Sequence, residues 1–152
     1  MNIITKPAKI GDYDSIYELW CSTPQSKRAL NPVDDSREGI ERFIKRNPGL
    51  SAVDVEDGKI VGAILCGHDG RRACLYHVCV SEEYRMHGIG KKMVLFCYEA
   101  LKKEKINKVC LNAFVTNTVG NKFWQKMGWT LRDDMNYYDH TLNEENLTIF
   151  NK

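Results

Sequence analysis

Two Asp-Gly dipeptides, at residues 57–58 and 69–70, divide residues 50–80 into three runs rich in apolar and β-branched side chains. Asp-Gly is typical of the tight turns that join neighbouring antiparallel strands, because such turns need a positive φ that these residues tolerate. The sequence therefore predicts an antiparallel meander of three strands, LSAVDVE, KIVGAILCGH and ACLYHVCV.

The segments on either side of the meander show both helical and strand periodicity. Apolar residues spaced by three and four predict helices over residues 12–22, 35–46, 89–105 and 117–128. Asp35 and Glu38 have the spacing of a capping box at the start of the second helix, and residues 23–35 before it are expected to form a loop. Further strands are expected at 3–9, 107–115, 129–141 and 147–150.

Composition excludes several classes of protein. The 22 Lys and Arg residues nearly balance the 20 Asp and Glu residues, and no basic block suggests nucleic-acid binding. No apolar run approaches the roughly 18 residues that span a bilayer, and the first residues lack the apolar core of a signal peptide. The six cysteines occur singly, which favours free thiols over a disulfide framework or a metal site. We therefore expect one cytoplasmic domain over residues 1–152; a homodimer stays open as its assembly.

The end of the third meander strand carries the strongest functional pattern, YHVCVSEEYRMHGIGKKM over residues 76–93. Arg85, Gly88 and Gly90 lie where the strand gives way to a helix. The first amides of a helix lack intrahelical partners, so they bind phosphate readily, and glycine lets a ligand approach the backbone. The pattern is neither a P-loop nor a G-x-G-x-x-G fingerprint. On these residues alone, anion binding and a purely conformational need for glycine both remain open.

The same corner, followed by NKVCLNAFVTNTVGNKFWQKMGW, resembles the GNAT superfamily of acetyl-CoA-dependent N-acetyltransferases. Arg85, Gly88 and Gly90 match its [RQ]-x-x-G-x-[GA] motif, and residues 117–129 match its later Asn-to-aromatic motif. The stretch GAILCGHDGRRACLYHV further resembles a small bacterial YpeA-like branch, grouped with the RimI-like enzymes. The resemblance implies a single α+β (mixed α/β) GNAT domain over residues 1–152. Its sheet would be mostly antiparallel, with about six or seven strands, splayed strands 4 and 5, and about four flanking helices.

The resemblance also implies a place for acetyl-CoA. The pyrophosphate would lie on the corner formed by Arg85, Met86, His87, Gly88, Ile89, Gly90 and Lys91. The pantetheine arm would run along the preceding strand, at Val78, Cys79 and Val80. Asn117 and Trp124, on the following helix, would complete the gap between the splayed strands.

The catalytic groups are less clear from the sequence. Attack on a thioester needs a neutral amine, so a base must remove a proton. ACLYHVCV holds no carboxylate, and His77 is its only side chain that titrates near neutral pH. We therefore consider His77 as the base or the holder of a water, with an ordinary half-exposed strand residue as the alternative. Glu82 and Glu83 are expected to be solvated.

The general acid is equally open, because Trp124 occupies the place of the family's usual tyrosine. An indole can donate a hydrogen bond but is no practical acid near neutral pH. Either the thiolate leaves unassisted, or a later tyrosine, Tyr138 or Tyr137, protonates it. Cys79 next to the cofactor is expected to be a buried thiol and not an acyl carrier, since no base adjoins it.

Three functions compete on these grounds. The first is an N-acetyltransferase that moves an acetyl group from acetyl-CoA to a primary amine, on a protein, a peptide or a small molecule, by direct attack. The second is a catalytically weak GNAT-fold module that binds or senses acyl-CoA, which Trp124 would favour. The third is an unrelated phosphate-binding domain. Residues 20–43 are expected to contact the acceptor, and their mixed charge does not identify it.

Overall fold

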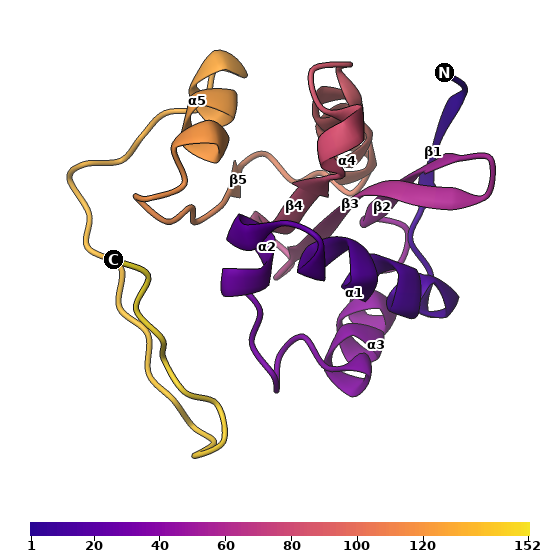
Figure 1. Ribbon diagram of the computed structural model, residues 1–152. Coiled ribbons are helices and arrows are strands. Elements are labelled where there is room, and N and C mark those ends of the chain that lie inside the picture. Colours follow the sequence, from indigo (N-terminus) through magenta and orange to yellow (C-terminus); the bar gives the residue numbers. More distant parts are fainter.

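The computed structural model describes residues 1–152, and its centre is a five-stranded sheet (Figure 1). The strands lie side by side in chain order: β1 (Ile3–Pro7), β2 (Ala52–Glu56), β3 (Lys59–His68), β4 (Ala73–Val80) and β5 (Val109–Cys110). The pairings from β1 to β4 are antiparallel, and β5 is parallel to β4. Asp57 and Gly58 both have positive φ between β2 and β3, which confirms the predicted meander and its first turn.

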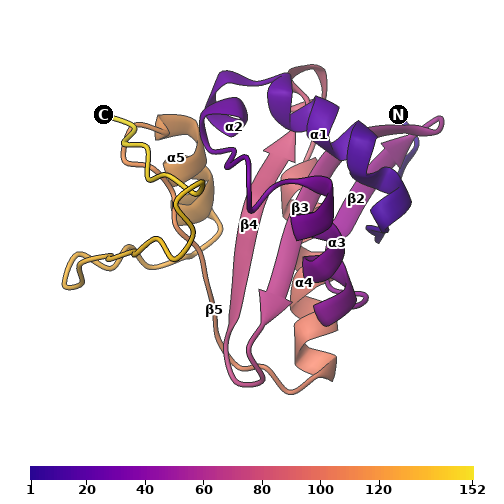
Figure 2. The same ribbon diagram turned by 90° about the horizontal axis from the view of Figure 1, so that it is seen from below.

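Five α-helices surround the sheet: α1 (Tyr13–Cys21), α2 (Pro24–Arg28), α3 (Arg37–Arg46), α4 (Ile89–Lys103) and α5 (Thr118–Lys126). Short 3-10 turns at Ile10–Asp12 and Glu82–Tyr84 precede α1 and α4. Figure 2 shows α1 and α3 on one face of the sheet, α4 on the other, and α5 beyond the β4 edge, level with the end of β4.

Each face of the sheet has its own apolar cluster. Trp20 and Ile16 of α1 pack with Leu65 and Cys79 under the α1–α3 layer. On the opposite face, Met93, Cys97 and Leu101 of α4 pack with Ile64 and Leu75. Complete burial of a large apolar side chain contributes about 1.5–3 kcal/mol. The two clusters together make β3 and β4 a rigid platform.

Asp54 of β2 is a charged residue buried within this packing. Its side chain is fully buried; the Thr5 hydroxyl donates a hydrogen bond to Oδ1, and Oδ2 has no partner. Burial raises the pKa of Asp54 above its usual value of 3.8.

The structure corrects the predicted number of strands. The sheet has five strands, not six or seven, because residues 129–141 and 147–150 form none and the predicted strand at 107–115 pairs only at Val109–Cys110. Alternating apolar residues indicate a strand only where a partner supplies hydrogen bonds, and residues 130–145 are all exposed.

Two helix predictions are also wrong. The expected loop at 23–35 contains α2, whose N-cap Thr23 accepts a hydrogen bond from the amide of Ser26. At α3 the N-cap is Ser36, whose Oγ accepts from the amide of Gly39, so Asp35 and Glu38 form no capping box. Asp35 is thereby free for another partner.

The chain's helices do not combine the length and apolar character that a membrane-crossing helix requires. All six cysteines are free thiols.

Candidate active site

The start of α4 presents a row of free backbone donors. The amides of residues 86–91 form no hydrogen bond within the chain; the first intrahelical donor is Lys92, which bonds to the carbonyl of Gly88 at 3.0 Å. Gly88 is the N-cap at φ +76°, and Met86 is also left-handed at φ +67°. Alternating left-handed residues turn successive amides toward a common concave side, which suits an anion. The side chains of Met86 and His87 are exposed, so the corner's donors are its backbone.

Glycine is favoured at the two positions of this corner for different structural reasons. A Cβ at Gly88 would meet nothing within 4 Å, so its positive φ is what favours glycine there. A Cβ at Gly90 would lie 3.3 Å from the ring of Phe123, so Gly90 leaves room for this side chain of α5 at the start of α4. Arg85 donates from Nε to the carbonyl of Val80 at 3.3 Å and ties the corner to the end of β4.

Beyond Cys110, β5 leaves β4, and a cavity of about 240 Å³ lies between the two segments. Its walls come from α2, β4, the segment after β5, and α5: Gln25, Ser26, Ala29, Leu75, Tyr76, His77, Val78, Leu111, Asn112, Ala113, Phe114 and Trp124. Three residues expected at the site, His77, Val78 and Trp124, therefore meet at one cavity. A larger cavity of about 590 Å³, lined by α4, β1 and residues 48–50, contains neither His77 nor the glycine corner, so it is not the site we consider.

His77 owes its position to a β-bulge in β4. Cys79 pairs with Ala63 and Tyr76 with Leu65, so His77 and Val78 together oppose Ile64. A bulge reverses the alternation of side chains across the sheet. Leu75 accordingly packs on the α4 face, whereas the His77 ring packs at a tilt against Trp20 on the opposite face, with ring centroids 4.8 Å apart. His77 is also left-handed at φ +48°, a conformation that costs a non-glycine residue about 1–3 kcal/mol.

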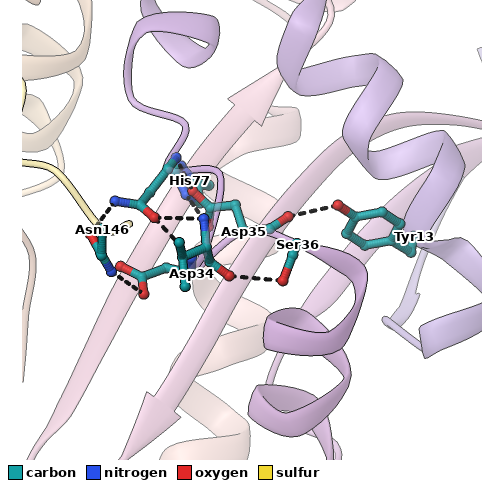
Figure 3. A network of polar contacts seen from close by, with 8 residues as sticks. Tyr13, Asp34, Asp35, Ser36, His77 and Asn146 are labelled. Atoms are coloured by element: carbon teal, nitrogen blue, oxygen red, sulfur yellow. Dashed lines mark hydrogen bonds and ion pairs between the residues drawn. The ribbon is translucent and has the colours of Figure 1, made fainter. Parts of the chain in front are cut away.

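A buried carboxylate faces His77. The Nε2 atom of His77 lies 2.9 Å from Oδ1 of Asp35, with side chains only 13% and 9% exposed. Figure 3 shows Asp35 between His77 and Tyr13. Asp35 was not predicted as a site residue, because its spacing to Glu38 indicates a helix cap.

Of the other predicted residues, Trp124 lines the cavity, whereas Asn117 and Tyr138 do not. Trp124 lines the cavity and packs edge-on against Phe123 and Trp129. Asn117 is the N-cap of α5, with Oδ1 accepting from the amide of Gly120 at 3.0 Å, so it shapes the start of that helix. Tyr138 is 85% exposed in the segment after α5 and is not a cavity residue.

Two further side chains of β4 stay protonated at neutral pH. Burial raises the pKa of the Cys79 thiol, and this effect exceeds the opposing ones of the Ser26 and Thr23 hydroxyls and of Arg85. This disfavours Cys79 as a nucleophile, as expected. Burial also raises the pKa of Tyr76, a cavity residue that the sequence analysis did not single out. Tyr76 is a cavity residue because the segment after β5 lies close to it, and no local sequence pattern predicts this contact.

Comparison with solved structures agrees with this architecture. The chain superimposes on the PaiA N-acetyltransferase of Thermoplasma acidophilum in complex with coenzyme A with a TM-score of 0.78, at 22% identity, covering 88% of this chain and 92% of that one. The similarity to Ard1 of Thermoplasma volcanium has a TM-score of 0.74 at 17% identity, covering 87% and 85%. At these identities the likeness shows the fold.

Sequence comparison identifies the family. The chain is 27% identical over 128 residues to an acetyltransferase of Sodalis glossinidius. The aligned residues cover 82% of this chain and 84% of that protein. It is 31% identical over 99 residues to an acetyltransferase of Photorhabdus laumondii, covering 65% and 64%. Residues 13–129 match the acetyltransferase (GNAT) family. The chain therefore belongs to the GNAT family and is an acetyltransferase.

Proposed function

We propose that the chain transfers an acetyl group from acetyl-CoA to a primary amine by direct attack while both substrates are bound. The observation that carries the proposal is that β4 leads directly from His77, on the cavity wall, to the unpaired amides of residues 86–91 at the start of α4. A row of free backbone donors and an imidazole therefore lie at two positions along the same strand and the turn that follows it. The bound coenzyme A in the structure of the Thermoplasma PaiA neighbour is consistent with this cosubstrate.

The corner residues fit the anionic end of coenzyme A. The amides of Met86, His87, Gly88, Ile89, Gly90 and Lys91 have no partner in the chain, and the dipole of the 15-residue α4 adds positive potential there. The Arg85 guanidinium adds a fixed charge beside them. The backbone of Val78, Cys79 and Val80 leads from this corner along β4 toward His77, where a pantetheine arm would lie. Asn117 and Trp124 would close the other side.

The cosubstrate supplies a thioester carbonyl and a thiolate leaving group. Amines are mostly protonated at neutral pH, so the acceptor must first lose one proton to water before its neutral nitrogen can attack. The attacking nitrogen must then lose a second N–H proton to a base, and His77 is the imidazole on the cavity wall that can accept it. As the nitrogen bonds to the carbonyl carbon, this proton passes to His77 and the C–S bond breaks with its electron pair on sulfur.

Trp124 lines the cavity as a hydrogen-bond donor without useful acidity. The modest pKa of a thiol allows the thiolate to leave without a general acid. Tyr138 stays our candidate if an acid is needed; a Tyr138→Phe variant with undiminished kcat would exclude it.

The test is an acetyl-transfer assay with amino acids, polyamines and peptides as acceptors, following thiol release and the acetylated product. We expect one amine class to be acetylated, and His77→Gln to lower kcat by about 10²–10⁴-fold. His140→Gln, an exposed histidine outside the cavity, is the matched control. Failure of every amine to accept an acetyl group would contradict the proposal. If coenzyme A still raised the melting temperature, the acyl-CoA-sensing alternative would be favoured.

A further inference from the structure

Both carboxylate oxygens of Asp35, its backbone amide and its backbone carbonyl all have hydrogen-bond partners within the chain. Its amide donates to the carbonyl of Asn31 at 2.9 Å, and its Oδ2 accepts from the amide of Asn31 at 2.7 Å. The hydroxyl of Tyr13 donates to the Asp35 carbonyl at 2.6 Å. The remaining oxygen, Oδ1, faces His77.

The loop that carries Asp35 is itself wound around Asn31. The side-chain oxygen of Asn31 accepts from the amides of Val33 and Asp34, both at 2.9 Å. Its side-chain amide donates to Asn146, which in turn donates to the Asp34 carboxylate at 2.8 Å (Figure 3). The segment after α5 thereby ties down the outer side of the loop, and Asp35 has little freedom to turn away from His77.

The two nitrogens of the His77 ring have different environments. An ionised carboxylate can only accept, so the Nε2 atom that faces Asp35 must carry a proton. The Nδ1 atom forms no hydrogen bond within the chain, and it is not one of the chain's buried unpartnered atoms, which belong to Trp20, Asp54 and Glu56. In the neutral ring, Nδ1 therefore holds an accessible lone pair.

We propose that Asp35 is a positioning residue that keeps His77 protonated on Nε2, so that Nδ1 is the atom that accepts the amine's proton. This inference rests on the proposed function. As the amine attacks, one N–H proton passes to Nδ1, the N–C bond forms, and the C–S bond breaks with its electron pair on sulfur. Asp35 also stabilises the imidazolium that results.

The competing structural reading is that the pair only anchors the loop of residues 31–36 to the sheet. Anchoring alone does not require the bulge that turns His77 away from the face of Leu75. Nor does it require a left-handed histidine at the wall of the cavity. Strain concentrated at one titratable residue is typical of functional sites.

The test is the tautomeric state of His77, read from long-range ¹H–¹⁵N correlation spectra at a pH where the ring is neutral. Wild-type protein should show the Nε2–H form without any substrate. In Asp35→Asn, the new amide oxygen can keep the bond from Asn31, and its NH₂ group then faces Nε2. The ring proton should move to Nδ1 and block it as an acceptor.

Kinetics give the second readout. Asp35→Asn should lower kcat about 10²-fold or more with an unchanged KM for acetyl-CoA, because Asp35 lines neither the cavity nor the glycine corner. Asp133→Asn is the matched control: it changes an exposed carboxylate outside the loop of residues 31–36 and should leave the His77 tautomer and kcat unchanged.

A wild-type ring protonated on Nδ1 would overturn the inference, and this measurement needs no variant to fold. Unchanged kcat in a folded Asp35→Asn would also overturn it. Absence of acetyl transfer to every amine would instead contradict the proposed function, while the tautomer result would still report on Asp35.

Discussion

The two buried carboxylates of the chain, Asp35 and Asp54, differ in whether their oxygens are satisfied. Both oxygens of Asp35 have partners, whereas Oδ2 of Asp54 has none. A buried charge without a partner disfavours the ionised form, and burial raises the pKa of Asp54 accordingly. The two buried aspartates thus differ in electrostatic cost, because only Asp54 keeps a carboxylate oxygen without a partner.

This difference predicts a pH dependence of stability. Because its folded pKa is raised, Asp54 binds a proton in the folded state over a pH range in which it is already ionised in the unfolded chain. The free energy of unfolding therefore falls as the pH rises from the usual value of 3.8 through the raised pKa. In Asp54→Asn this contribution is absent, so urea denaturation at pH 4 and pH 7 should show the variant gaining stability relative to wild type at pH 7. A constant difference between the two pH values would contradict the raised pKa.

At the scale of elements, helix α4 begins with a left-handed glycine, and the chain has another left-handed glycine in the turn between β2 and β3, where no ligand is expected. Gly88 has φ +76° at the helix start, and Gly58 has φ +78° in the turn between β2 and β3. A Cβ at either position would meet nothing within 4 Å. The two glycines therefore share a left-handed conformation that is free of strain for glycine and strained for any residue with a Cβ.

Alanine at these two positions separates folding from binding. Gly88→Ala and Gly58→Ala should each lower the free energy of unfolding by about 1 kcal/mol, the cost of a left-handed alanine. Only Gly88→Ala should weaken coenzyme A binding, by about tenfold or more, because it alone disturbs the amides of residues 86–91. Calorimetric titration measures the affinity. Equal affinities in the two variants would place the pyrophosphate elsewhere.

At the scale of the whole molecule, the segment after α5 is the part least covered by the fold. Figure 1 shows it extending away from the sheet before it returns. Its exposed large apolar residues are Leu131, Met135, Tyr137, Tyr138, Leu142, Leu147, Ile149 and Phe150. Exposed apolar groups gathered in one segment favour association with another surface.

We therefore expect concentration-dependent self-association, measured by light scattering after size exclusion. Replacing Ile149 and Phe150 by serine should shift the chain toward the monomer, because it removes apolar area from this segment. Ile4→Ser, which changes an exposed isoleucine on β1, is the control and should have little effect. A monomer mass at every concentration of the unmodified chain would contradict the expectation.

The sequence predicted the parts of the fold that local chemistry determines. Asp57-Gly58 specified a turn, and the apolar spacing before Lys103 specified α4, because turn conformation and helical periodicity are properties of neighbouring residues. The strands expected after α5 depended on a distant partner, and local alternation could not supply one.

The candidate site shows the same limit. The glycine corner was visible in the sequence because helix starts have a local signature. The bulge at His77 contains no glycine that would indicate it in the sequence. It arises from the register between β3 and β4, which local residues do not determine. Asp35 was misread because Ser36, one residue later, is the better cap, and its contact with His77 spans 42 residues.

The bulge in β4 determines which of its side chains point to each face of the sheet. Past it, Val78 and Val80 pack toward α4, while His77 looks toward α1 and α2. If acetyl-CoA binds on the α4 side of β4 and the amine is deprotonated on the α1–α2 side, the two substrates enter the site from opposite faces of the sheet. Mutations in the α1–α2 layer could then redirect the enzyme to a new acceptor while its hold on the acyl donor stays as it was.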